Sequence, residues 1–315
     1  MVSYINVHAI LNARRRVAQA SESTQGPRVI IVGPEDSGKR TLTKMLINWA
    51  AKEAWKPTFV DLDVSQGSVS IPGSVAATPI ETPLDPVEGF PLDMPLVCYY
   101  GHTKPGTNVA LYKATVKELA GVLERQFLGN PESRAAGMVI NTMGWSDGSI
   151  VTVSMRSKTN LDVVELQKSG GVVAKNSEFR KLARSCRIRE YFYGPSKELS
   201  PYAYTCSFGD VKVFRIGGGP QAPRSALPIG SDPVSDPLKV TPVTVSIDER
   251  DLLHSVLAVS YAQEPDQIVS TSVSGFVYVT EVNVQKKTLT YIAPSQGTLP
   301  SKFLVAGSLS WLESH

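Results

Sequence analysis

Residues 27–45 read PRVIIVGPEDSGKRTLTKM and place Gly33, Gly38 and Lys39 in G-x-x-x-x-G-K spacing after an apolar run. This spacing is typical of a phosphate-binding loop, whose backbone N–H groups surround nucleotide phosphates at the positive end of a helix dipole. The lysine would hold the β- and γ-phosphates. We therefore expect a nucleotide-binding loop made of Gly33, Pro34, Glu35, Asp36, Ser37, Gly38, Lys39, Arg40 and Thr41.

One position of this loop departs from the usual pattern. The residue after the lysine is normally Ser or Thr, whose hydroxyl ligates Mg²⁺ between the phosphates. Here that residue is Arg40, and Thr41 follows it. Thr41 lies about 100° further around the helix, so it does not simply take over the missing hydroxyl. Nucleotide binding and catalysis are therefore separate questions for this chain.

Two acidic residues end the next apolar segment, KPTFVDLD, at residues 56–63. This segment is typical of a buried strand, and ligands of open α/β sheets bind at the carboxyl ends of strands. Asp61 and Asp63 are thus expected to face the phosphates. A solvated or capping carboxylate is the alternative for Asp61.

The elements that must position these residues alternate between strands and helices. Apolar spacing predicts helices over 4–20, 110–128 and 176–190, strands over 28–32 and 136–142, and a Pro-rich loop over 79–95. This alternation predicts an α/β fold, a P-loop NTPase-type parallel sheet with flanking helices.

A Gly-, Pro- and Ser-rich stretch after Gly217 is typical of a linker or a long surface loop. Beyond it we expect a helix over 248–262, in which His254 is a surface or core residue rather than a ligand, followed by three strands. These strands are predicted over 268–284, 288–294 and 303–312. The chain then divides into a nucleotide-binding domain at 1–200 and a small α+β C-terminal domain at 201–315.

Composition narrows the function classes. Of the 315 residues, 42% are apolar and 19% are charged, enough to bury one or two cores. A net charge of +3 is too small for a polybasic nucleic-acid binder. Three widely spaced cysteines argue against a disulfide framework or a structural zinc site, and no apolar run approaches the ~20 residues of a membrane span.

Motifs spread over nearly the whole chain resemble one family. They are FVDLDVSQGSVSIPGS after the loop, HTKPGTNVALY, the strand end INTMGW, KSGGVV before an Arg-rich helix, and REYFYG. Together they resemble the eukaryotic Clp-type polynucleotide 5′-hydroxyl kinases, subunits of the pre-mRNA 3′-end cleavage factor II, in a plant-like form. The resemblance implies a nuclear protein that binds ATP, Mg²⁺, an RNA 5′ end and other cleavage-factor subunits.

The family architecture implied by the resemblance is an N-terminal β-sandwich, a central P-loop domain and a C-terminal α/β domain. Here we expect the N-terminal β-sandwich to be absent and the central domain to be shortened near 146–168. A missing central strand would expose the edges of its neighbours. Either residues 150–155 replace that strand or the chain is a degenerate copy.

The implied reaction is transfer of the ATP γ-phosphoryl group to an RNA 5′-hydroxyl, catalysed mainly by positioning and charge neutralisation. Lys39 would hold the phosphates and Asp63 would accept the hydroxyl proton. Thr41 and Asp61 are the expected Mg²⁺ ligands, and Gln66 would contact the metal shell or the acceptor phosphate.

Two further segments would complete the site. Trp145 would stack on the terminal RNA base, although core packing is the alternative. Thr107 belongs to a loop, HTKPGTN, that resembles a substrate clasp but could equally cap a helix. Lys175 and Arg180 would act as a basic lid over the phosphates, unless they belong to an ordinary charged helix face.

Three functions remain open from the sequence. The chain is an active RNA 5′-hydroxyl kinase, an ATP-holding cleavage-factor subunit whose kinase activity is weakened by Arg40, or a truncated copy with neither role. Arg40 favours the second.

Overall fold

The computed structural model of this chain describes residues 2–85, 89–90, 95–144, 161–217, 236–243 and 252–312. Its elements belong to two compact units, which are described separately. One unit contains residues 1–98 and 116–187, and the other contains residues 99–115 and 188–315. The chain thus passes between the units inside a helix at residue 187, earlier than the boundary predicted at 200, and a segment near residue 100 also belongs to the second unit.

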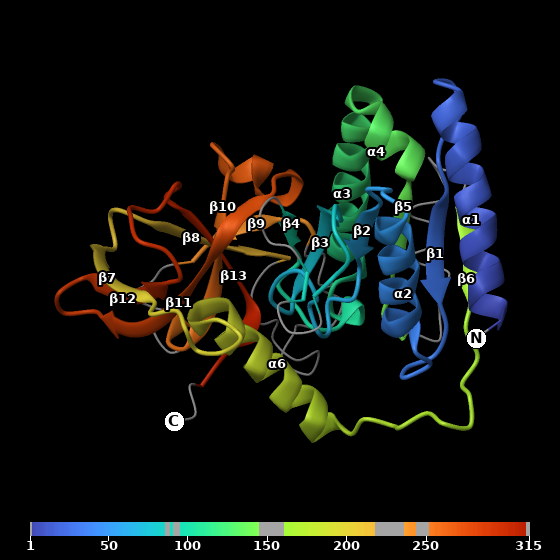
Figure 1. The fold of residues 1–315 in the computed structure, drawn as a ribbon. Helices are drawn as coiled ribbons and strands as arrows, with labels where there is room; N and C mark the ends of the chain where they lie inside the picture. The colour runs from blue at the N-terminus through green and yellow to red at the C-terminus, as the bar shows by residue number, and fades with distance from the viewer. Residues whose placement is uncertain are drawn as a thin grey trace, which may run out of the picture. The chain divides into compact units, whose positions relative to one another are not determined.

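The first unit is built on a mainly parallel sheet with the strand order β4-β3-β2-β5-β1-β6 (Figure 1). Its strands are β1 (Arg28–Val32), β2 (Thr58–Asp61), β3 (Ser74–Pro79), β4 (Leu96–Tyr99), β5 (Met138–Asn141) and β6 (Asp162–Glu165). β1 pairs in parallel with β5 and β6, β2 pairs in parallel with β5, and β3 runs antiparallel to β2. The carboxyl ends of β1, β2, β5 and β6 therefore lie at the same edge of the sheet.

Helices accompany this sheet. Those that lie wholly in the first unit are α1 (Val2–Ala20), α2 (Lys39–Lys52) and α4 (Pro131–Ala136). α3 (Val109–Gly129) and α6 (Ser177–Tyr193) each continue from one unit into the other, and the 3₁₀ helix η1 (Pro105–Thr107) belongs to the second unit. α2 packs on β1 and β5, and α1 contacts α2 and α4. The buried central strands read as continuous apolar runs because both of their faces are covered. The predicted parallel sheet with flanking helices is confirmed.

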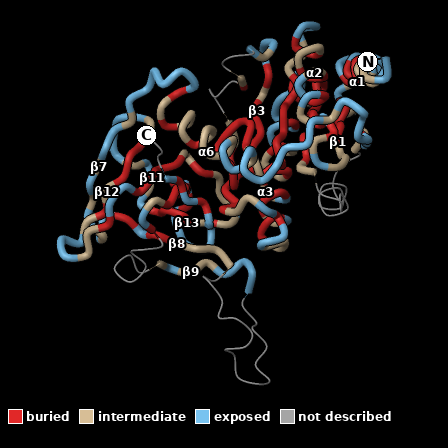
Figure 2. Tube along the Cα trace, turned by 90° about the horizontal axis from the view of Figure 1, so that it is seen from below, coloured by how far each residue is buried: buried red, intermediate tan, exposed pale blue. Residues whose placement is uncertain are grey.

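The second unit is a sheet with the strand order β7-β12-β11-β10-β13-β8-β9. Its elements are β7 (Tyr202–Ser207), β8 (Lys212–Ile216), β9 (Val240–Pro242), β10 (Ser255–Ser260), η3 (Pro265–Ser270), β11 (Val273–Asn283), β12 (Thr288–Ala293) and β13 (Phe303–Ser310). Its apolar core includes Leu257, Val279 and Leu304. Burial falls toward the edge, where β7 is half-buried to exposed while β10 is buried throughout (Figure 2).

The helix predicted over 248–262 is wrong for its second half. Residues 255–260 form β10, a central strand between β11 and β13, and residues 244–251 lie outside the described part of the chain. The run SVLAVS is apolar on both faces of the strand, and its apolar positions therefore also fit a helical spacing. His254 stands in the turn before this strand with a φ of 62°, and its Nδ1 lies 2.9 Å from the Tyr278 hydroxyl.

Other predicted elements are confirmed. α1, α3 and α6 match the predicted helices, and β1, β2, β5 and the last three strands match the predicted strands within a few residues. Three strands of the first sheet, β3, β4 and β6, were not predicted, and neither were β7, β8 and β9. The proposed replacement strand at 150–155 lies outside the described residues.

A bilayer-crossing helix would have to be both long and apolar. Among the helices that the structure describes, none meets both requirements.

Candidate functional site

The loop between β1 and α2 adopts a conformation that depends on two glycines. Gly33 has a φ of +147° and Gly38, directly before α2, has a φ of +90°. A side chain at Gly33 would place its Cβ 2.3 Å from the Leu166 carbonyl oxygen, so only glycine fits there. α2 starts at Lys39, and its first hydrogen bond runs from Leu42 N to Gly38 O over 3.0 Å. The loop thus presents its backbone at the positive end of a helix, as phosphate binding requires.

Lys39 folds back over its own loop. Its Nζ donates hydrogen bonds to the carbonyl oxygens of Gly33, at 2.9 Å, and Pro34, at 2.6 Å. Burial lowers the pKa of the lysine, and the nearby carboxylates of Asp63 and Asp36 raise it in part. The two carbonyls accept from N–H groups of the ammonium that could otherwise donate to a phosphate. The ammonium is therefore already held at the loop.

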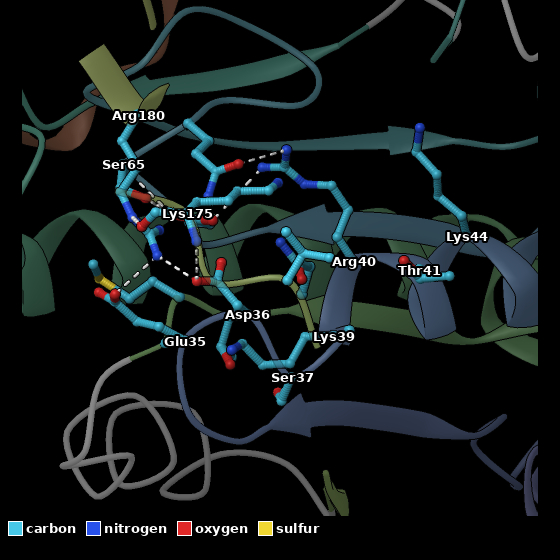
Figure 3. Close-up of a pocket in the computed structure, with 18 of the residues that line it drawn as sticks. Glu35, Asp36, Ser37, Lys39, Arg40, Thr41, Lys44, Ser65, Lys175 and Arg180 are labelled. Atoms are coloured by element: carbon cyan, nitrogen blue, oxygen red, sulfur yellow. Dashed lines mark hydrogen bonds and ion pairs between the residues drawn. The ribbon is translucent and has the colours of Figure 1, made fainter. Parts of the chain in front are cut away.

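Two acidic residues of the loop hold the predicted lid. Arg180 Nη2, near the start of α6, lies 2.8 Å from Asp36 Oδ2 and 3.0 Å from Glu35 Oε2. The backbone N–H of Lys175 also donates to Asp36 Oδ2, at 3.1 Å. The three charged side chains point toward one another in Figure 3. Of the two lid cations, Arg180 thus pairs with carboxylates of the loop, where an anionic ligand would compete for its guanidinium.

The two aspartates after β2 occupy different environments. Asp61 is buried and its carboxylate accepts three hydrogen bonds, from Asp63 N, Asn141 Nδ2 and Ser68 N, at 3.1, 2.9 and 2.9 Å. Its register partner across the sheet is Asn141, the last residue of β5. Asp61 therefore links the loop after β2 to the end of β5. Its carboxylate acts as a cap for backbone and side-chain N–H groups, the alternative role considered for it, rather than as a free metal ligand.

Asp63, in contrast, lines the cavity. Its Oδ1 accepts hydrogen bonds from the backbone and the hydroxyl of Ser65, and its Oδ2 faces Arg40. Burial, followed by the charge of Asp61, raises the pKa of the Asp63 carboxyl, while Arg40 and Ser65 lower it in part. A buried carboxyl of this kind is a candidate for proton transfer.

Arg40 reaches from the first turn of α2 to the loop after β2. Its Nη1 donates to Gln66 Oε1 at 3.1 Å, and its Nη2 lies 3.6 Å from Asp63 Oδ2. Nη2 is shielded from solvent and has no hydrogen-bond partner among the described residues. The guanidinium thus sits between two residues that the sequence assigned to the reaction.

These side chains surround one cavity of about 490 Å³. Its lining from the loop and α2 is Glu35, Asp36, Ser37, Gly38, Lys39, Arg40, Thr41, Lys44, Met45 and Asn48. The rest of the lining is Asp63, Ser65, Gln66, Asn141, Thr142, Met143, Gly144, Val173, Lys175 and Arg180. A polar cavity of this size with converging cations suits a phosphorylated ligand.

The structure brings most of the predicted site residues together at this cavity. Gly33 and Pro34 take part through the carbonyls that hold Lys39. Thr107 ends η1 in the second unit, where the next residue, Asn108, caps α3 through a hydrogen bond from Leu111 N of 3.0 Å. Trp145 and the shortened segment's residues 146–160 lie outside the described residues.

Several residues at the cavity were missed by the sequence reasoning. Lys44 lies one helical turn after Arg40, and burial, then Arg40 and Arg187, lower the pKa of its ammonium. Asn141 ends β5 and Gly144 follows it, both in the motif INTMGW. The Lys44 spacing of four residues from Arg40 was a readable signal, because positions i and i+4 share a helix face.

The described residues do not fit a P-loop magnesium ion. The position that usually supplies the hydroxyl ligand carries Arg40. Both carboxylate oxygens of Asp61 accept hydrogen bonds from N–H groups of the protein. Thr41 lines the cavity but is solvent-exposed. Mg²⁺ prefers an octahedral set of oxygen ligands, and a guanidinium carries no acceptor atom.

Comparison with known proteins gives consistent matches. The family model described as "mRNA cleavage and polyadenylation factor CLP1 P-loop" matches residues 33–159, and "Pre-mRNA cleavage complex II protein Clp1" matches residues 199–313. The chain is 69% identical to "Protein CLP1 homolog" of Arabidopsis thaliana, over 100% of this chain and 78% of that protein. It is 39% identical to "Polyribonucleotide 5'-hydroxyl-kinase Clp1" of Homo sapiens, over 99% of this chain and 79% of that protein.

A solved structure shares the fold. It describes an extended interface between Pcf11p and Clp1p and the basis for ATP loss in a glycine-to-arginine mutant, with a TM-score of 0.81 and 24% identity over 99% of this chain and 80% of that chain. The family resemblance predicted from the sequence motifs is thereby confirmed. With two family models covering both units and relatives matched over almost its whole length, this chain belongs to the Clp1 family.

Proposed function

We propose that this chain binds ATP in the P-loop cavity as a Clp1-type subunit of the mRNA 3′-end cleavage and polyadenylation machinery, with its polynucleotide 5′-hydroxyl kinase activity weakened by Arg40. The observation that carries this proposal is the position of the Arg40 guanidinium, between Gln66 and Asp63. The name of the human relative, a polyribonucleotide 5′-hydroxyl-kinase, supports the reaction class.

The reaction would need few groups from the protein. The RNA 5′-oxygen attacks the γ-phosphorus, the bond between that phosphorus and the β-bridging oxygen breaks, and ADP leaves. Asp63 would take the proton of the attacking hydroxyl. Lys39 and Arg180 would stabilise the charge on the transferred group, since preorganised cations act where charge is concentrated.

Arg40 opposes this chemistry in two ways. It holds Gln66, which the sequence assigned to the acceptor side, through the hydrogen bond of 3.1 Å. It also lies beside Asp63 and offsets part of the rise that burial and Asp61 cause in the pKa of that carboxyl, which weakens it as a proton acceptor. ATP binding depends on the loop backbone, Lys39 and the lid, so it survives both effects better than turnover does.

The test compares the native chain with Arg40→Ser in two measurements, ATP binding by calorimetry and γ-phosphoryl transfer to a 5′-hydroxyl RNA. We expect both proteins to bind ATP and the variant to transfer phosphate at least about tenfold faster, as expected when a general base is restored. Lys52→Ser is the matched control, because Lys52 is exposed at the other end of α2. Equal transfer rates in the native chain and in Arg40→Ser would refute the role of Arg40.

A second candidate is an active RNA kinase. It is favoured by the convergence of Lys39, Asp63, Lys175 and Arg180 on one cavity. Native transfer as fast as that of Arg40→Ser, together with ATP binding, would select it. Absence of ATP binding in both proteins would select a degenerate copy.

We also propose a partner and a compartment. Solved structures with this fold are described as complexes of Clp1p with Pcf11p, which supports a cleavage-factor partner for this chain as well. Such a subunit would act in the nucleus. Co-purification of the tagged chain with a Pcf11-type protein from nuclear extract tests both statements, and recovery of the chain only from the cytoplasm would refute the second.

A further inference from the structure

The cavity is lined by a cation, Arg40, at the sequence position where phosphate-binding loops usually carry the hydroxyl ligand of a metal ion. We infer that Arg40 replaces Mg²⁺, so that this chain binds its nucleoside triphosphate in the metal-free form. The inference rests on the ATP binding proposed above and concerns which charge state of the nucleotide the site selects.

Arg40 is held in place from the protein side. It belongs to the first turn of α2, and its Nη1 donates to Gln66 Oε1 at 3.1 Å. Nη2 lies 3.6 Å from Asp63 Oδ2, which orients the guanidinium without completing a hydrogen bond. A guanidinium carries five N–H donors. Nη2 is shielded from solvent, but the Arg40 side chain as a whole is 33% exposed and lines the cavity. Its accessible donors remain for a phosphate, which arginine binds through several N–H groups.

The carboxylates near the loop are engaged by protein groups. Both oxygens of Asp61 accept hydrogen bonds from N–H groups around the ends of β2 and β5. Asp63 presents one oxygen to Ser65 and the other to Arg40. A metal ion placed between loop and carboxylates would have to displace the guanidinium and break contacts that the fold already makes.

The charge around the cavity points the same way. Five basic side chains line it, against three acidic ones; the basic residues are Lys39, Arg40, Lys44, Lys175 and Arg180. Bound Mg²⁺ would neutralise two of the negative charges of the nucleotide and add its own repulsion to these cations. The metal-free nucleotide keeps those charges and pairs them with the basic side chains, so it is the form that the cavity complements best.

The experiment is calorimetric titration of ATP into the native chain, once in EDTA and once in excess Mg²⁺. We expect a dissociation constant in EDTA equal to or lower than that in Mg²⁺. For Arg40→Ser we expect the reverse order, with binding in Mg²⁺ at least tenfold tighter than in EDTA. Lys52→Ser, on the exposed end of the same helix, should keep the native order.

The outcomes separate this inference from the proposed function. Native binding that requires Mg²⁺ would overturn the inference and leave ATP binding intact. No native binding in either buffer would overturn both, because the proposed ATP site itself would be absent. The two titrations of the native chain test the inference by themselves. The test therefore remains valid if Arg40→Ser fails to fold.

Discussion

Arg40 and Asp63 form an ion pair at the cavity beside the loop between β1 and α2, with 3.6 Å between Nη2 and Oδ2. The pair joins the first turn of α2 to the loop after β2, and it is the feature that most separates this site from the usual phosphate-binding loop. Around it, the pKa of Asp63 remains raised by burial and by Asp61. The arginine therefore compensates only part of the cost of a buried carboxylate.

This balance predicts how stability depends on pH. The pKa of Asp63 is higher in the folded than in the unfolded state, so the folded state loses stability as pH rises from the unfolded pKa through the folded one. Asp63→Asn removes the charge while its Oδ1 still accepts from Ser65. We expect a higher Tm than native at pH 8, with the difference shrinking toward pH 4. A lower Tm at pH 8 would mean that Arg40 over-compensates the carboxylate.

Lys39→Met tests the loop itself. The lysine provides the ammonium nearest the loop carbonyls, and hydrogen bonds to charged groups contribute about 1.5–3 kcal/mol. ATP affinity should fall at least about tenfold, measured by calorimetry. Lys52→Met, in the same helix but away from the cavity, is the control. Unchanged affinity in Lys39→Met would place the nucleotide elsewhere.

Gly144→Ala probes the contact between the β5 end and the loop. A Cβ at Gly144 would lie 2.4 Å from Glu35 Cα, a distance that backbone atoms do not tolerate. The loop must shift, so we expect weaker ATP binding by about tenfold with a small change in Tm. Gly170→Ala is the control because a Cβ there meets nothing within 4 Å. Native-like binding in Gly144→Ala would show that the loop adapts.

Asp36→Asn should release the lid. The carboxylate accepts from Lys175 N and pairs with Arg180 at 2.8 Å, and the amide keeps only part of these contacts. Hydrogen exchange of residues 173–180 should therefore accelerate several-fold, while exchange in β1 stays native. Glu178→Gln, on the same helix, should leave both unchanged. Native-like slow exchange in the Asp36 variant would mean that the ion pair between Glu35 and Arg180 is enough to hold the lid.

Asp61→Asn distinguishes a positioning carboxylate from a metal ligand. One of its three N–H donors would face the new amide nitrogen, and an unsatisfied buried donor costs about 1–3 kcal/mol. The free energy of unfolding, from urea titration, should fall by that amount without any added metal. Asp162→Asn, on the exposed ion pair with Arg14, should cost less than about 1 kcal/mol. A loss that appears only with Mg²⁺ would favour the metal role.

The sequence predicted the parts of the site that are local in the chain. The loop spacing, the acidic end of β2 and the basic start of α6 are each a short pattern of residues close together in the sequence. What it did not predict depends on pairing across the sheet. Asn141 becomes a partner of Asp61 only because β2 and β5 are aligned in register, and no local pattern encodes that alignment.

The fold shows the same division. Long amphipathic helices such as α3 and buried runs such as β1 were predicted because their apolar periodicity is strong. β6 is a four-residue edge strand that alternates between half-buried and exposed positions, which gives little signal. β10 was taken for a helix because its apolar run satisfies both periodicities, and only its place between β11 and β13 decides between them.

The contact of Gly33 with the Leu166 carbonyl has a thermodynamic consequence for the ligand. The segment after β6 lies against the first glycine of the loop, and the segment after β5 lies against Glu35. The loop is therefore confined from two sides by packed backbone and gains its shape when the chain folds. A nucleotide that binds a preorganised loop loses less conformational entropy, so affinity should depend more on charge than on loop ordering.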